Sequence, residues 1–252
     1  MIELQGLAKR YGAFDAVRNL NLSVAKGEVF GFLGPNGAGK TTTIRMMMGI
    51  LVPTSGRISI AGLDSRVERT EVNRRVGYLP DSPIYYDFLR CREILEFVAE
   101  MHGYTRADAR TRAAALLKEL ALEDAAEEYA VNFSMGMKKK LGLACALIHE
   151  PPVLILDEPT NGLDPRAAHD VQERLRLSAA AGRTIFLSTH LLAMAEKLCT
   201  RIGIINRGEL VAAGTLAQLR AALAADDSLE QLFLRLTEPD AMPEAHGTLG
   251  PA

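Results

Sequence analysis

Short apolar runs and helical patterns alternate along this chain of 252 residues. Two runs, within Glu28–Leu33 and Val153–Leu156, are continuously apolar, as is typical of central parallel strands buried on both faces. Further strands are predicted at Ile2–Leu4, Ala16–Val24, Arg57–Ala61, Thr184–Ser188, Ile202–Ile205 and Glu209–Ala212. Asn206-Arg207-Gly208 predicts a hairpin turn between the last two of them. The pattern indicates an α/β protein with a mainly parallel sheet.

The middle of the chain lacks this strand pattern. From about Arg90 to Glu150, the apolar residues follow helical spacing. Thr105–Asp108 predicts a capping box, with Asp in place of the usual Glu, that opens a helix running to about Leu122. Another helix is expected from about Met137 to His149. We expect these helices to form an inserted helical subdomain over about residues 88–150.

The last third returns to alternating strands and helices. Asp164-Pro165 predicts a helix start, with Asp as N-cap and Pro at the first helical position, and Gly182 predicts its end. An amphipathic helix is expected over about residues 228–237, and the Pro-, Gly- and Ala-containing tail 238–252 is predicted to be disordered. Residues 1–237 would then form one domain.

Composition indicates the cellular compartment and limits the classes of partner. The chain has 48% hydrophobic and 24% charged residues, and 29 basic against 31 acidic side chains give a net charge of −2. This balance disfavours nucleic acid as a partner. The three cysteines, Cys91, Cys145 and Cys199, lie far apart in apolar surroundings and are expected to be reduced core residues. No apolar run is long enough for a membrane span, and the N-terminus does not resemble a signal peptide, so we expect a cytoplasmic protein.

Residues Gly34–Thr41 satisfy the phosphate-loop pattern G-x-x-x-x-G-K-[ST], between a predicted strand and a predicted helix over Thr42–Ile50. Glycines let backbone N–H groups wrap around a phosphate chain, and the helix N-terminus attracts the same anion. Lys40 would reach the β- and γ-phosphates, and the Thr41 hydroxyl would hold Mg²⁺. The expected nucleotide-binding residues of this loop are Gly34, Pro35, Asn36, Gly37, Ala38, Gly39, Lys40, Thr41 and Thr42.

Acidic and imidazole side chains follow two of the predicted buried strands. Asp157 and Glu158 end one strand, where ligands of doubly wound sheets bind. Asp157 is placed to bind Mg²⁺, and Glu158 is placed to accept a proton from an attacking water. His190 follows another strand and is placed to hydrogen-bond the γ-phosphate. We therefore expect Lys40, Glu158 and His190 to be catalytic.

Two other stretches have weaker signals. Tyr11 could stack on a nucleotide base, or it could be an ordinary packing residue. The run Phe133–Lys140 precedes a helix, with Ser134 as N-cap and Gly136 allowing close backbone approach. Its three lysines could form a solvated first turn, but lysine at a helix start opposes the dipole, so local stability does not explain them.

The order of these motifs resembles that of an ATP-binding cassette (ABC) ATPase over about residues 2–215. The matching stretches are Tyr11, Gly34–Thr42, Phe133–Met137, Leu156–Asp164 and Ser188–His190. The run Asp157–Pro165 and the Ser-x-Gly-Met-Lys signature, Ser134–Lys138, look most like those of the subfamily that serves type-2 exporters. The resemblance implies a P-loop NTPase core with a small N-terminal antiparallel β subdomain and an inserted α-helical subdomain.

The resemblance also implies a head-to-tail homodimer that binds ATP and Mg²⁺. Each ATP would lie between one subunit's phosphate loop and the other's signature, where Ser134 and Gly136 would contact the γ-phosphate. Residues 161–164 would line the dimer seam. The chain departs from the family's Leu-Ser-Gly-Gly-Gln signature at Phe133, Met135 and Met137.

A second departure concerns Asp81, which stands where the family has a glutamine that contacts Mg²⁺ and links to the membrane domain. Asp81 is therefore expected as a metal ligand, together with Thr41 and Asp157. The segment Ser82–Phe88 is where the partner's cytoplasmic helix would dock, although it could instead pack on its own helical subdomain.

The functional hypothesis is an ATP-hydrolysing subunit that powers a separate membrane-embedded exporter through ATP-driven dimerisation. It would lie on the inner face of the cell membrane through an integral-membrane permease, without a span of its own. The alternatives are a non-transport ABC protein in DNA repair or on ribosomes, and a nucleotide sensor with weak hydrolysis. The intact Glu158 and His190 argue against the sensor, and the charge balance argues against nucleic acid. The cargo is not encoded in this chain.

Overall fold

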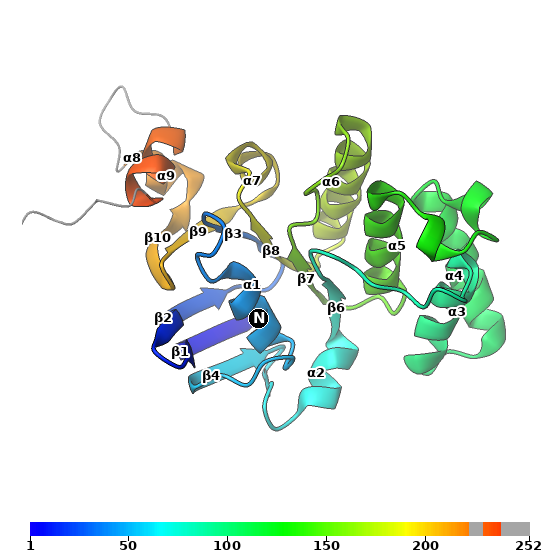
Figure 1. The fold of residues 1–252 in the computed structure, drawn as a ribbon, viewed down its shortest axis with the longest axis horizontal. Helices are drawn as coiled ribbons and strands as arrows, with labels where there is room; N and C mark the ends of the chain where they lie inside the picture. Colours follow the sequence, from blue (N-terminus) through cyan, green and yellow to red (C-terminus); the bar gives the residue numbers. More distant parts are fainter. Residues whose placement is uncertain (222–228, 238–252) are drawn as a thin grey trace, which may run out of the picture.

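The computed structural model describes residues 1–221 and 229–237, and its centre is a six-stranded sheet (Figure 1). The strand order is β10-β9-β3-β8-β7-β6, and all neighbours are parallel except β9 and β10. Its strands are β3 (Val29–Leu33), β6 (Val76–Leu79), β7 (Val153–Asp157), β8 (Thr184–Thr189), β9 (Arg201–Asn206) and β10 (Glu209–Thr215). The predicted α/β fold with a mainly parallel sheet is confirmed.

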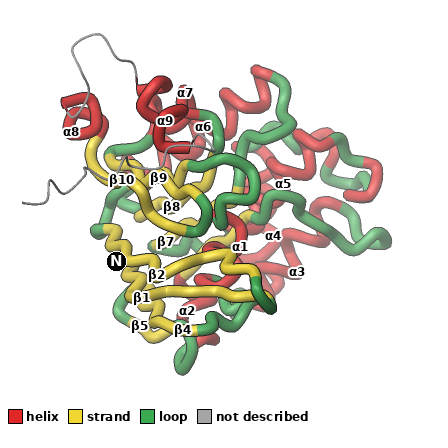
Figure 2. Tube along the Cα trace, turned by 60° about the vertical axis from the view of Figure 1, so that its left-hand side comes forward, coloured by secondary structure: helices red, strands yellow, loops and turns green. Residues whose placement is uncertain are grey.

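The central strands explain why their sequences are continuously apolar. Every residue of β3, β7 and β8 is buried. One side of the sheet is covered by α1 (Lys40–Met47) and the antiparallel strands, and the other by helices (Figure 2). A strand covered on both faces has no solvent side on which polar residues could alternate.

A second sheet of four antiparallel strands contains the N-terminus, and its order is β2-β1-β4-β5. Its strands are β1 (Ile2–Tyr11), β2 (Phe14–Val24), β4 (Ser55–Ile60) and β5 (Leu63–Asp64). The first predicted strand, Ile2–Leu4, was too short. The exposed polar residues of its second half weaken the sequence pattern, but backbone pairing continues to the Tyr11–Phe14 pair at the hairpin.

Residues 90–150, all described, contain no strand apart from a single bridge between Arg90 and Tyr129. The elements are α3 (Cys91–Met101), α4 (Arg106–Glu119), the short 3₁₀ helices η1 (Glu123–Ala125) and η2 (Ala130–Asn132), and α5 (Met135–Leu147). Figure 1 shows this helical block beside the edge strand β6. Thr105 caps α4 by accepting a hydrogen bond from the Asp108 N–H, but the Asp108 carboxylate accepts from the Thr105 hydroxyl, not from its backbone.

The remaining helices are α2 (Arg69–Arg75), α6 (Pro165–Ala180), α7 (Leu192–Leu198), α8 (Leu216–Ala221) and α9 (Leu229–Thr237). Asp164 caps α6 as predicted, accepting from the N–H groups of Arg166 and Ala167. Sequence analysis missed α2, α7 and α8, which have six or seven residues each and too few turns for a clear helical period. The predicted tail 238–252 lies outside the described residues.

All three cysteines are free, and burial raises the pKa of each thiol to about 12. A thiol with such a pKa stays protonated and unreactive at neutral pH, which agrees with the predicted core role. Over residues 1–221 and 229–237, none of the helices combines the length and the apolar character that crossing a bilayer requires.

Candidate functional site: a nucleotide pocket at the strand ends

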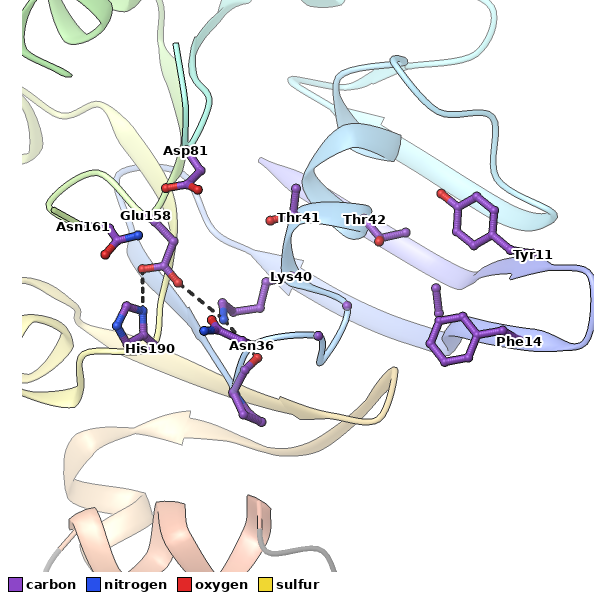
Figure 3. A pocket seen from close by; sticks show the side chains of 14 residues that line it. Tyr11, Phe14, Asn36, Lys40, Thr41, Thr42, Asp81, Glu158, Asn161 and His190 are labelled. Carbon is purple, nitrogen blue, oxygen red and sulfur yellow. Dashed lines mark hydrogen bonds and ion pairs between the residues drawn. The ribbon is translucent and has the colours of Figure 1, made fainter. Parts of the chain in front are cut away.

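A cavity of about 600 Å³ opens where β3, β7 and β8 end (Figure 3). It brings together residues that lie up to 179 positions apart in the sequence, from the N-terminal hairpin to the residue after β8. Its lining residues are Tyr11, Phe14, Ala16, Pro35, Asn36, Gly37, Gly39, Lys40, Thr41, Thr42, Asp81, Glu158, Asn161 and His190. Gly34 and Ala38 belong to the predicted loop but do not line the cavity, and Ala38 is buried.

The phosphate loop connects β3 to α1, whose first residue is Lys40. The Lys40 side chain is 6% exposed, and its ammonium donates to the carbonyl oxygens of Gly34, at 2.7 Å, and Pro35, at 3.2 Å. It also lies 3.4 Å from Glu158 Oε1. The loop therefore curls around the lysine whose charge a phosphate chain would need.

Gly34 is required by its packing. A Cβ built on it would lie 2.4 Å from the carbonyl oxygen of Ile205 at the end of β9. The loop therefore starts in direct contact with the neighbouring strand, and only glycine fits there.

Asp157 ends β7 and is 1% exposed. Its carboxylate accepts a short hydrogen bond from the Ser188 hydroxyl on β8. Burial raises the pKa of Asp157, while hydrogen bonds from Ser188 and Thr41 oppose the rise. A buried carboxylate beside a threonine hydroxyl at a phosphate loop suits a hard divalent cation. The described residues contain no cluster of three or more His, Cys, Asp or Glu side chains that could hold a metal, so phosphate oxygens would have to complete its coordination.

Glu158, the next residue, has a left-handed backbone with φ 48°. Its side chain has different partners from that of Asp157. Glu158 Oε2 lies 3.0 Å from His190 Nδ1, and Oε1 faces Lys40. The side chain is thus held between an imidazole and an ammonium at one end of the cavity (Figure 3).

Two aromatic side chains lie at the other end, across the phosphate loop (Figure 3). Tyr11 is 47% exposed and Phe14 is 63% exposed, and they pair across the β1–β2 hairpin. Sequence analysis missed Phe14. Its only signal was a second aromatic three residues after Tyr11, just before a predicted strand, and this is meaningful only once the hairpin is known to face the loop.

Asp81 follows β6 and lies on the rim of the cavity. Its Oδ1 is 3.3 Å from the ammonium of Lys139, the fifth residue of α5. That lysine is 1% exposed, and its neighbour Lys140 pairs with Asp170 at 2.8 Å. Burial lowers the pKa of Lys139, and Asp81 opposes the shift. Lys139 and Lys140 are therefore not part of a solvated first turn, and sequence analysis missed Lys139 as a neighbour of the site.

The structure does not bring the signature residues to this cavity. Ser134 and Gly136 line a separate cavity of about 380 Å³ with Asp164 and Ala167. Ser134 caps α5, accepting from the Met137 N–H at 3.2 Å. The N-terminus of α5 is thus formed and capped but lies away from the phosphate loop of its own chain.

The family model described as "ABC transporter" matches residues 17–161 of the chain. The "Nod factor export ATP-binding protein I" of Paraburkholderia xenovorans is 42% identical over 230 residues, which are 91% of this chain and 75% of that protein. A solved structure titled "Structure of ATP binding subunit of ABC transporter" has a TM-score of 0.87 and 36% identity, covering 94% of this chain and all of that one. The "Dimeric Structure of MJ0796, a Bacterial ABC Transporter Cassette" has a TM-score of 0.79 and 25% identity, covering 86% and 99%.

Proposed function

The chain belongs to the ABC transporter family as an ATP-binding subunit, and from this premise we propose that it hydrolyses ATP to power a separate membrane-embedded exporter. The observation that carries this proposal is the position of Glu158 between Lys40 and His190, at the end of the cavity opposite Tyr11 and Phe14. An ATP molecule would extend from the aromatic pair, which suits its base, to the charged cluster, which suits its γ-phosphate.

Hydrolysis would be an in-line attack by water on the γ-phosphorus. The water oxygen forms the new P–O bond, the bond to the β–γ bridging oxygen breaks, and Glu158 accepts a proton from the water. Lys40 would leave its loop carbonyls to balance the charge of the β- and γ-phosphates. His190 would fix the Glu158 carboxylate and hydrogen-bond the γ-phosphate.

Thr41 and Asp157 are the residues that would hold Mg²⁺, because the hydroxyl and the buried carboxylate already adjoin each other. Bound Mg²⁺ would supply positive charge to the phosphate oxygens. Asp81 is not included in this metal site, because its Oδ1 lies 3.3 Å from the Lys139 ammonium, and its predicted role as a third ligand stays untested.

Dimerisation would bring the partner's Ser134 and Gly136 to the γ-phosphate. Support comes from the capped N-terminus of α5, which lies apart from its own phosphate loop, and from the dimeric structure to which the chain is similar. A helix N-terminus offers free N–H groups to an anion. ATP would therefore stabilise the dimer by mass action.

The segment after Asp81 supports a permease-docking face. Tyr85 packs inward and donates to the Lys138 carbonyl at 2.6 Å, which anchors the segment. Ile84, Tyr86 and Phe88 are exposed, at 93%, 56% and 73%. Exposed aromatics beside an anchored backbone suit a helix of a membrane partner. Through that partner, the subunit would lie on the inner face of the cell membrane.

Replacing the proposed base tests the mechanism. Glu158→Gln should keep ATP binding and ATP-dependent dimerisation but lose about 10²- to 10⁴-fold in turnover, because the amide cannot accept the proton. Phosphate release would measure turnover, and light scattering would measure the dimer. Glu173→Gln is the matched control, since Glu173 pairs with Arg176 on the exposed surface of α6. Undiminished phosphate release by the Glu158→Gln protein would contradict the mechanism.

A further inference from the structure

The lysines at the start of α5 work against the helix dipole, yet the fold buries one of them. Lys139 is among the largest fully buried side chains of the described residues, and the others of that rank are Phe, Ile, Leu and Met. A buried ammonium is costly unless charged or polar partners surround it. Its partners therefore indicate what it is retained for.

The Lys139 ammonium has two partners, both at the nucleotide pocket. It donates to the backbone carbonyl oxygen of Glu158 at 2.7 Å and to Asp81 Oδ1 at 3.3 Å. Asp81 comes 58 residues earlier in the chain, and Glu158 comes 19 residues later. One cation on α5, which we call the signature helix because it begins within the signature stretch, thus joins the loop after β6 to the loop after β7.

The carbonyl contact matters because the Glu158 backbone is in the left-handed region, which is unfavourable for glutamate. The Glu158 N–H donates toward Ser188, with 3.1 Å to Oγ and 3.2 Å to the carbonyl oxygen. Lys139 holds the opposite side of the residue through its carbonyl oxygen. The unusual turn that aims the carboxylate at His190 and Lys40 is therefore fixed from both sides.

The carboxylate contact matters because negative charge is concentrated at this end of the pocket. Asp81 and Glu158 line the pocket, and the buried carboxylate of Asp157 lies close enough to interact electrostatically with both. The carboxylate of Asp81 brings a charge that the family's glutamine does not have. Without a cation next to it, that charge would repel the phosphates.

We propose that Lys139 is a positioning residue with two roles: it neutralises Asp81 at the nucleotide pocket, and it fixes the backbone turn that aims Glu158. The second role rests on the proposed function of Glu158 as general base. On this proposal, the helix that would bind the partner's ATP through its N-terminus also holds the backbone of Glu158 in its own subunit. Lys139 then affects both the binding of ATP and the orientation of the Glu158 carboxylate.

A double-mutant cycle on the full chain tests the charge role: Lys139→Met, Asp81→Asn and the double variant. The readout is the affinity for Mg²⁺ and a non-hydrolysable ATP analogue with a β–γ imido bridge, measured by calorimetry. Lys139→Met should weaken binding about tenfold, because Asp81 is left unpaired. Asp81→Asn should bind as tightly as the parent chain or tighter, and the double variant should recover to within about threefold of the parent.

Asp81→Asn also separates this proposal from a metal-ligand role for Asp81. Loss of a ligand would weaken binding of the Mg²⁺ complex, whereas loss of the charge partner of Lys139 would not. Weaker binding by Asp81→Asn, or no recovery in the double variant, would overturn the charge role. Lys138→Met, which removes a charge from the same helix turn, should show no coupling to Asp81→Asn.

Turnover tests the second role. At saturating ATP, kcat should fall about 10- to 100-fold in both Lys139→Met proteins, with or without Asp81→Asn, because the Glu158 carbonyl loses its donor in both. Lys139→Gln keeps an N–H donor without the charge. It should weaken nucleotide binding as Lys139→Met does, but with a smaller loss of kcat, and it replaces that variant if Lys139→Met does not fold.

An unchanged kcat in the Lys139→Met/Asp81→Asn protein would overturn the positioning role. Failure of the proposed function is a different result: the parent chain would release no phosphate, while the calorimetric cycle would still report on the Lys139–Asp81 pair. Asp81→Asn alone involves a residue whose side chain is 42% exposed, so it should fold and keeps the test decisive.

Discussion

The phosphate-loop end and the signature end of this subunit differ in how completely their own chain surrounds them. At the phosphate loop, Lys40 and Asp157 are buried, and their partners come from the ends of β7 and β8 and from the loop itself. At the signature, Ser134 caps the folded helix α5, but Ser134 and Gly136 face a cavity that Asp157 and Glu158 do not line. The fold of one subunit thus completes the phosphate-loop end, whereas the signature would contact nucleotide only in the proposed dimer.

A glycine-to-alanine substitution should have the most different effects at the two ends. Gly136→Ala places a Cβ at 3.6 Å from Ala167 Cβ, an ordinary contact, whereas Gly34→Ala would place it 2.4 Å from the Ile205 carbonyl. We expect Gly136→Ala to leave the melting temperature unchanged but to lower turnover about tenfold or more, equivalent to ~1.4 kcal/mol lost at the γ-phosphate contact.

Gly34→Ala should instead lower the free energy of unfolding by about 1–3 kcal/mol, because the loop or β9 must move. Chemical denaturation and phosphate release measured on both proteins would check the pair. If Gly136→Ala unfolded the subunit, or if it left ATP-dependent dimerisation and turnover intact, the signature would not be an intermolecular site.

The aromatic end of the pocket should contribute less. Tyr11→Ala and Phe14→Ala should each raise the KM for ATP about 3- to 10-fold with little change in kcat, since stacking on the base affects binding and not the reacting phosphate. Leu234, an exposed residue of α9, gives a control: Leu234→Ala should leave KM unchanged. A fall in kcat at saturating ATP would show that the hairpin acts on the chemistry instead.

The smallest expected effect concerns how the signature helix is anchored at its far end. His149, just after α5, lies 3.2 Å from the Val76 carbonyl oxygen and stacks on His102 with 3.7 Å between ring centres. Burial, followed by the charge of His102, lowers the pKa of His149 to about 4, from an ordinary 6.5, and the Val76 carbonyl opposes the shift. Burial and Arg74 also lower the pKa of His102.

The unfolded chain binds a proton at His149 more readily than the folded one. The contribution of His149 to the free energy of unfolding is therefore complete above pH 6.5 and is lost as the pH falls toward 4. We expect about 1 kcal/mol from this source, less than the full linkage value because the ring is only partly buried. Urea denaturation at pH 5 and 7.5 would measure it. His149→Gln should flatten the pH dependence, and the exposed His169→Gln should not; equal slopes in both would rule out His149 as the cause.

Local sequence patterns were sufficient for much of this molecule. The buried strands β3 and β7, the cap of α6 and the phosphate loop each depend on fewer than ten consecutive residues. Sequence analysis did not predict the edge strand β6, because four residues that include a glycine carry too little pattern. Its strand character comes from pairing with β7, which lies 77 residues later in the chain.

The fold class and the family follow from the order of elements and motifs along the whole chain. The phosphate loop, the strand-end acids and His190 are each specified by residues close together in it, so the sequence was enough to identify them. Only the tertiary structure decided which distant groups meet: Phe14 with Tyr11 at the pocket, Lys139 with Asp81 and Glu158, and the separation of Ser134 from its own phosphate loop. The physical reason is that a buried charge finds its partners through packing across the whole domain. No local pattern of polar and apolar residues records that pairing.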